Sequence, residues 1–135
     1  MQPAPNPIDP NLSIGHVHLR TADIDRVRDF YVGVLGFDVT AEARDVPGWG
    51  TTGDLLFVSA GGYHHHLGLN TWRGEGVPPM PEGSVGMRHW TLVLDDAADV
   101  AAVRERLTAA GAPVEERPGG FLTRDPQNNA VVIHS

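Results

Sequence analysis

The strand and helix patterns of this chain occur in the same order twice, and this repeat constrains the fold most. In each half, alternating apolar residues typical of a strand are followed by a helical pattern that ends at a glycine. These glycines, Gly36 and Gly111, are 75 positions apart, and His16 and His89 at matching places in the two strands are 73 apart. The sequence therefore predicts one structural unit used twice.

Each half contains one helix followed by three further strands. Asp23 is a good N-cap for the first helix, and the second begins in an acidic cluster at residues 95–99. Strand patterns cover residues 13–20, 37–43, 54–60 and 64–72 in the first half and 88–94, 114–117, 121–124 and 130–134 in the second. We expect an α+β fold of two βαβββ modules whose curved mixed sheets form a cup-shaped cavity.

The length of 135 residues fits one domain. Residues 1–12 are rich in proline and predict a flexible N-terminal segment, and residues 13–135 predict the single domain. Within it we expect module one at 13–72, a linker rich in glycine and proline at 73–86, and module two at 87–135.

Two residue types are missing, and each absence excludes chemistry. Without cysteine there is no thiolate nucleophile, disulfide or cysteine-bound metal, and without lysine there is no Schiff base or P-loop. The formal net charge of −7 argues against a nucleic-acid partner. The sequence has neither an apolar run that would span a membrane nor a signal-peptide pattern, so we expect a cytoplasmic protein with no membrane partner.

Histidine is the one residue type in clear excess, with seven copies. Neutral imidazoles from separate strands can bind a divalent metal. Strand alternation places several side chains on the cup face of the predicted sheets: His16, His18, His65, His89, Val132 and His134. From these we predict a metal site formed by His16, His65 and His89, with His18, His134 and Val132 lining the pocket or, for the histidines, supplying a further ligand.

The run of three histidines at residues 64–66 needs a separate assignment. Because neighbouring strand residues point to opposite faces, we expect His65 to share a face with Leu67 and Leu69. His64 and His66 are then expected on the outer face, away from the metal.

Three stretches carry a resemblance to a known family: residues 14–20, residues 29–37, and Asp125-Pro126 with Asn129. They resemble the vicinal oxygen chelate superfamily, which includes glyoxalase I, extradiol dioxygenases, and bleomycin and fosfomycin resistance proteins. Residues 64–72 are similar to the histidine-rich strand of its catechol-2,3-dioxygenase-like branch. The resemblance covers nearly the whole chain from Ser13 onward, and implies metal ligands on the strands of His16 and His65 and a Glu on the last strand. In glyoxalases the strand of His89 also contributes.

The chain departs from this pattern at two places. Val132 occupies the position where the family has its Glu, and residues 54–60 lack the histidine expected of an extradiol dioxygenase. Two functions therefore remain open. One is a metal-dependent enzyme, dioxygenase-like or glyoxalase-like, that uses Fe(II), Mn(II), Ni(II) or Zn(II) on a small oxygenated or aromatic metabolite. The other is a metal-free pocket that sequesters a small molecule, as in bleomycin resistance proteins. We expect a homodimer in either case, and the sequence assigns no catalytic residue.

Overall fold

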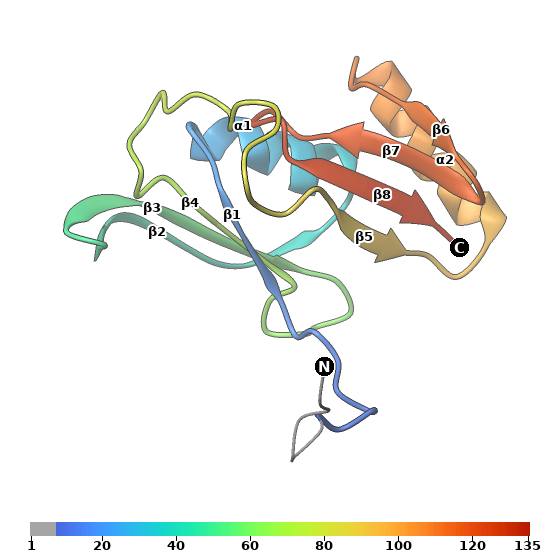
Figure 1. Cartoon of the computed structure of the whole chain (residues 1–135), viewed down its shortest axis with the longest axis horizontal. Coiled ribbons are helices and arrows are strands. Elements are labelled where there is room, and N and C mark those ends of the chain that lie inside the picture. The colour runs from blue at the N-terminus through green and yellow to red at the C-terminus, as the bar shows by residue number, and fades with distance from the viewer. Residues whose placement is uncertain (1–7) are drawn as a thin grey trace.

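The computed structural model describes residues 8–135 and contains two four-stranded sheets (Figure 1). Residues 1–7 of the expected N-terminal segment lie outside this described part. The first sheet has the order β1-β4-β3-β2 and the second β5-β8-β7-β6. The strands are β1 (Val17–Arg20), β2 (Asp38–Gly48), β3 (Thr51–Ser59), β4 (Leu67–Asn70), β5 (Trp90–Val93), β6 (Glu115–Arg117), β7 (Gly120–Arg124) and β8 (Ala130–His134).

Both sheets have the same pairing scheme. The first strand of each module runs parallel to the last, as β1 does to β4 and β5 to β8, and the other pairs are antiparallel. The edge strands β1 and β5 face the middle of the molecule (Figure 1). The predicted α+β fold of two βαβββ units with open curved sheets is therefore confirmed.

A helical segment covers one face of each sheet. In the first module, α1 (Ile24–Arg28) is capped by Asp23 and continues as a π-helical turn, η1 (Asp29–Val34). In the second, the Asp96 carboxylate caps α2 (Ala97–Ala109). The hydrophobic core lies between these helices and the sheets, and includes Val27, Leu56, Leu69, Leu107, Val131 and Ile133.

The fourth strand differs from its expected form. It begins at Leu67 rather than near His64, and Leu67 and Leu69 are buried against the helices. The expectation that they share the cup face with His65 is wrong, because Gly68 and Asn70 face away from the helices. His65 precedes the regular strand and is not bound by its alternation.

Strands β2 and β3 are longer than predicted and form a hairpin with Trp49 in its turn. The segment between β4 and β5, residues 71–89, contains no helix or strand. In the described part of the chain, neither helix combines the length and apolar character needed to cross a bilayer.

Candidate metal centre and adjoining cavity

Three histidines converge where the first and last strands of module one begin. His16 precedes β1, and His64 and His65 precede β4. Because β1 and β4 are parallel neighbours with Val17 opposite Leu67, residues just before the two strands come together. One ring nitrogen from each of His16, His64 and His65 lies within 4.8 Å of the other two.

Packing fixes the orientation of His65. Its ring stacks on Phe57 with a centroid distance of 4.2 Å and an angle of 10° between the planes. Phe57 is paired with Gly68 and points away from the helices, so His65 lies on the open face of the sheet. The His16 ring lies 4.5 Å from the His65 ring.

His18 lies beside this cluster, above a glycine. A methyl group added at Gly68 would lie 2.5 Å from Nε2 of His18, so the imidazole occupies space that any larger residue would fill. The His18 ring is 5.6 Å from that of His16 and 6.3 Å from that of His65.

The electrostatics favour uncharged imidazoles at this end of the sheet. Desolvation lowers the pKa of His65, and the neighbouring histidines, His16 first, lower it further. Burial and then His16 lower the pKa of His18. Neutral imidazole is the form that coordinates a metal, and three such nitrogens close together fit a divalent ion. Among residues 8–135, the cluster contains only histidine ligands.

The other predicted site residues lie elsewhere. His89 is exposed just before β5 and does not belong to the cluster. Val132 and His134 are half-buried on β8 in the second sheet, and Nδ1 of His134 lies 3.2 Å from the Ser135 carbonyl oxygen. The structure thus brings His16 and His65 together and adds His64, for which sequence alternation predicted the outer face. His66 instead places Nδ1 3.1 Å from Oγ of Ser59.

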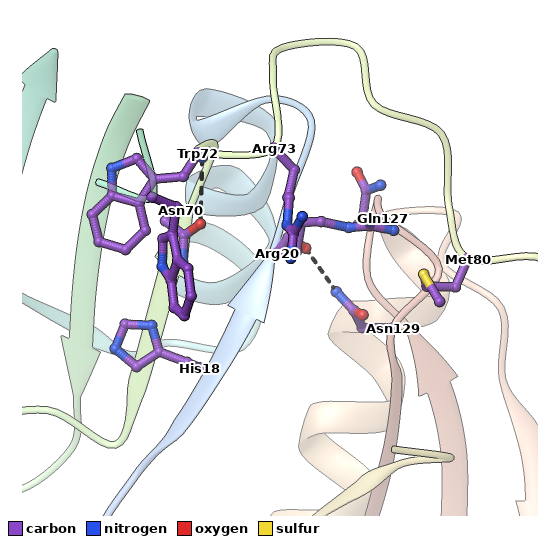
Figure 2. Close-up of a pocket in the computed structure, with 9 residues that line it drawn as sticks. His18, Arg20, Asn70, Trp72, Arg73, Met80, Gln127 and Asn129 are labelled. Carbon is purple, nitrogen blue, oxygen red and sulfur yellow. Dashed lines mark hydrogen bonds between the residues drawn. The ribbon is translucent and has the colours of Figure 1, made fainter. Parts of the chain in front are cut away.

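A cavity of about 640 Å³ adjoins this cluster at His18. Figure 2 shows first-module side chains on one side and second-module side chains on the other. The lining residues are His18, Arg20, Trp49, Asn70, Trp72, Arg73, Met80, Gln127 and Asn129. Of these, His18 is among the pocket-lining residues predicted from the sequence. Alternation along the first strand could have found Arg20, but it offers no signal that the Asp125–Asn129 turn lies opposite.

Two amide side chains of that turn form hydrogen bonds with the first module and with the segment that follows it. Gln127 Oε1 accepts a hydrogen bond of 2.7 Å from the Ala22 amide, and its Nε2 donates to the Val77 carbonyl at 3.0 Å. Nδ2 of Asn129 donates to the Arg20 carbonyl at 3.3 Å. We call these three hydrogen bonds the module clamp. They hold together the two halves of the chain, and residues of both halves line the cavity.

Comparison with known proteins decides the family. Residues 13–132 match the family model described as "Glyoxalase/Bleomycin resistance protein/Dioxygenase superfamily". The chain belongs to this superfamily. The match agrees with the resemblance carried by the strand of His16 and by the turn that begins at Asp125.

Individual members of the superfamily are similar to most of this chain. A catechol-2,3-dioxygenase of Bacillus subtilis is 39% identical over 119 residues, which are 88% of this chain but only 39% of the relative. The chain therefore spans about two fifths of that protein's length.

Two solved structures show the same fold. The lactoylglutathione lyase of Agrobacterium tumefaciens has a TM-score of 0.61 at 29% identity, covering 93% of this chain and 94% of the other. The glyoxalase I of Leishmania major has a TM-score of 0.69 at 20% identity, covering 93% and 87%.

Proposed function

We propose that this protein is a metal-dependent enzyme acting on a small oxygenated, ring-containing metabolite, in the manner of a dioxygenase or a glyoxalase. The observation that carries the proposal is the position of His16, His64 and His65 beside a cavity of about 640 Å³. That volume suits one small molecule. Fe(II), Mn(II), Ni(II) and Zn(II) are all compatible with imidazole ligands.

In this proposal His16, His64 and His65 hold the metal. When bound, the ion would act as a Lewis acid toward neighbouring oxygen atoms of the substrate. The remaining roles belong to the chain itself. His18 lies between the cluster and the cavity, where its ring nitrogen can accept a hydrogen bond from a substrate hydroxyl. Trp72 and Asn70 form the wall against which the substrate is oriented.

Metal titration of protein purified without an affinity tag tests the proposal. We expect calorimetry with each of the four ions to detect one site per chain, and His16→Ala and His65→Ala to weaken it at least about tenfold. His134→Ala is the matched control, because His134 lies on the second sheet. Equal metal affinity in the wild type and His16→Ala would contradict the proposal.

Activity assays then separate the two reaction types. The relatives suggest oxygen uptake with catechols for a dioxygenase, and turnover of lactoylglutathione for a lyase. We expect one of these activities to depend on added metal and on His16. Metal binding without either activity would restrict the proposal to a metal-binding protein.

A second candidate is a non-catalytic protein that sequesters a small molecule. It is favoured by the absence of a carboxylate from the histidine cluster and by Val132 at the position where the resemblance expects Glu. An Fe(II) site of two histidines and one carboxylate is therefore not formed by these residues. Tight binding of an unchanged ligand by metal-free protein would support this candidate.

The proposal retains two expectations about the protein's state, a homodimer and a cytoplasmic location. An open apolar groove between β1 and β5 supports the homodimer. The groove is lined in part by Ile14 and Val93, whose exposed fractions are 80% and 64%. A second copy would bury these side chains. Light scattering after size exclusion tests the dimer, and cell fractionation tests the location.

A further inference from the structure

The cavity beside His18 contains positive charge that the protein leaves uncompensated. Arg20, half-buried at the end of β1, and Arg73, just after β4, both line it, and among residues 8–135 no aspartate or glutamate does. The chain as a whole has 17 acidic residues and ten basic ones. Several other guanidinium groups form ion pairs with carboxylates, namely those of Arg28, Arg44, Arg104 and Arg117.

The two cavity arginines have few partners of their own. Within residues 8–135, the Arg20 guanidinium makes a single hydrogen bond, of 3.4 Å to the Pro78 carbonyl, and that of Arg73 makes none. Arginine is the side chain best suited to pair with a carboxylate through two parallel hydrogen bonds. An anionic group on a ligand would therefore complement the two guanidinium groups at this end of the cavity.

Two tryptophans give the cavity an aromatic part, and Trp72 is held in place. Nε1 of Trp72 donates a hydrogen bond of 2.9 Å to the Val46 carbonyl, and the indole lies directly over Gly48. Trp49, in the turn of the β2–β3 hairpin, also lines the cavity and has an exposed fraction of 86%. A planar ring is the ligand shape that would stack against these indoles.

Asn70 supplies a neutral hydrogen-bonding group between the charged and aromatic parts. Its Oδ1 accepts a bond of 3.4 Å from the Trp72 amide, and in the described part of the chain its Nδ2 has no partner. Figure 2 shows Asn70 on the same side of the cavity as Trp72 and His18, with Arg20 and Arg73 beyond it. Nδ2 is thus free to donate to a ligand oxygen.

We infer that the substrate or ligand of this cavity is a small aromatic anion, a planar ring bearing a carboxylate or a similar group. The anionic group lies at Arg20 and Arg73, the ring lies against Trp72, and oxygen substituents on the ring point toward His18. This inference rests on the proposed function for the direction of those oxygens. The charge preference itself rests only on the cavity.

Three ligands with the same ring show how binding depends on the charge of the ligand, separately from its shape. They are 2,3-dihydroxybenzoate, its uncharged isostere 2,3-dihydroxybenzamide, and catechol, with phenyl phosphate and inorganic phosphate as further arms. Quenching of tryptophan fluorescence measures binding, because two of the three tryptophans line the cavity. We expect the benzoate to bind at least about tenfold more tightly than the amide or catechol, since bonds to charged groups are the stronger ones. The preference should diminish at high salt.

Variants locate the charge effect. We expect Arg73→Gln and Arg20→Gln each to reduce the affinity for 2,3-dihydroxybenzoate about tenfold and to leave the affinity for catechol unchanged. Arg73 is exposed, so its substitution should leave folding intact. Arg117→Gln is the matched control, because Arg117 pairs with Glu115 on the surface. Tighter binding of phenyl phosphate than of benzoate would make a phosphate the anionic group, and binding of inorganic phosphate alone would overturn the aromatic part.

The same experiment distinguishes this inference from the metal proposal. The preference for 2,3-dihydroxybenzoate over 2,3-dihydroxybenzamide comes from the arginines and not from a metal. It should therefore persist in metal-free protein and in His16→Ala. Equal affinity for benzoate, amide and catechol in the wild type would overturn the inference while leaving the metal titrations untouched. Unchanged benzoate binding in both arginine variants would overturn it as well.

Discussion

The Tyr31 hydroxyl donates a buried hydrogen bond of 2.8 Å to Oδ2 of Asp125, a residue 94 positions away in the other module. Asp125 also accepts bonds from the Asn129 and Gln127 amides and from Nδ2 of Asn129. Desolvation raises the pKa of the Asp125 carboxyl, and these hydrogen bonds oppose that shift. The hydrogen bond from Tyr31 to Asp125 therefore also stabilises the turn that forms the module clamp.

Tyr31→Phe should destabilise the fold. It removes one donor from a buried carboxylate, and a buried group that loses a partner costs about 1–3 kcal/mol. Urea denaturation followed by circular dichroism measures the change. Tyr63→Phe, at an exposed site, is the control, and equal unfolding free energies for Tyr31→Phe and the wild type would contradict the role given to this bond.

Stability should decrease as the pH falls below about 6.5, the ordinary histidine pKa. The folded-state pKa values of His18 and His65 are lowered, so the unfolded chain binds protons first on acidification. Because the unfolded state then holds more protons, the free energy of unfolding decreases across this window. The double variant His18→Gln, His65→Gln should show a shallower decrease in melting temperature, and an identical slope would refute the assignment.

The third metal ligand distinguishes the structure from the sequence-based expectation. Because His64, and not His89, belongs to the cluster, His64→Ala should weaken metal binding at least about tenfold and His89→Ala should leave it unchanged. Elemental analysis after dialysis against limiting metal checks this. The reverse result would favour the set His16, His65 and His89 predicted from the repeat.

Gly48→Ala should impair ligand binding without touching a polar group. The added methyl group would overlap the Trp72 indole, which must then leave its position on the cavity wall. We expect weaker quenching by aromatic ligands and a shifted emission maximum. Gly33→Ala is the control, since a methyl group there meets nothing within 4 Å. Unaltered binding in Gly48→Ala would show that Trp72 does not orient the ligand.

The repeat predicted the fold well because its signals are local. Each signal acts within a few residues along the chain. The signals are strand alternation, the helix caps at Asp23 and in the acidic cluster, and the glycines that end the helical patterns. The length of β4 was not predictable in this way. Its start at Leu67 depends on pairing with β1 and β3, which strand alternation alone does not reveal.

The candidate site was predictable only in part, for the same reason. The sequence-based prediction placed His16 and His65 together because strand alternation put both side chains on the predicted cup face. It put His64 on the outer face by extending regular alternation into a segment that is not a strand. The cavity residues Arg73 and Gln127 lie outside regular strands, and their proximity follows from how the two modules dock.

The module clamp links ligand binding in the cavity to hydrogen exchange at the Ala22 amide. Gln127 accepts a hydrogen bond from the Ala22 amide of the first module and donates one to the Val77 carbonyl in the segment between the modules. A molecule that spans both modules would favour the docked arrangement, and this would slow exchange of the Ala22 amide hydrogen with solvent. Ala22 does not line the cavity, so its exchange rate would serve as a remote indicator of occupancy.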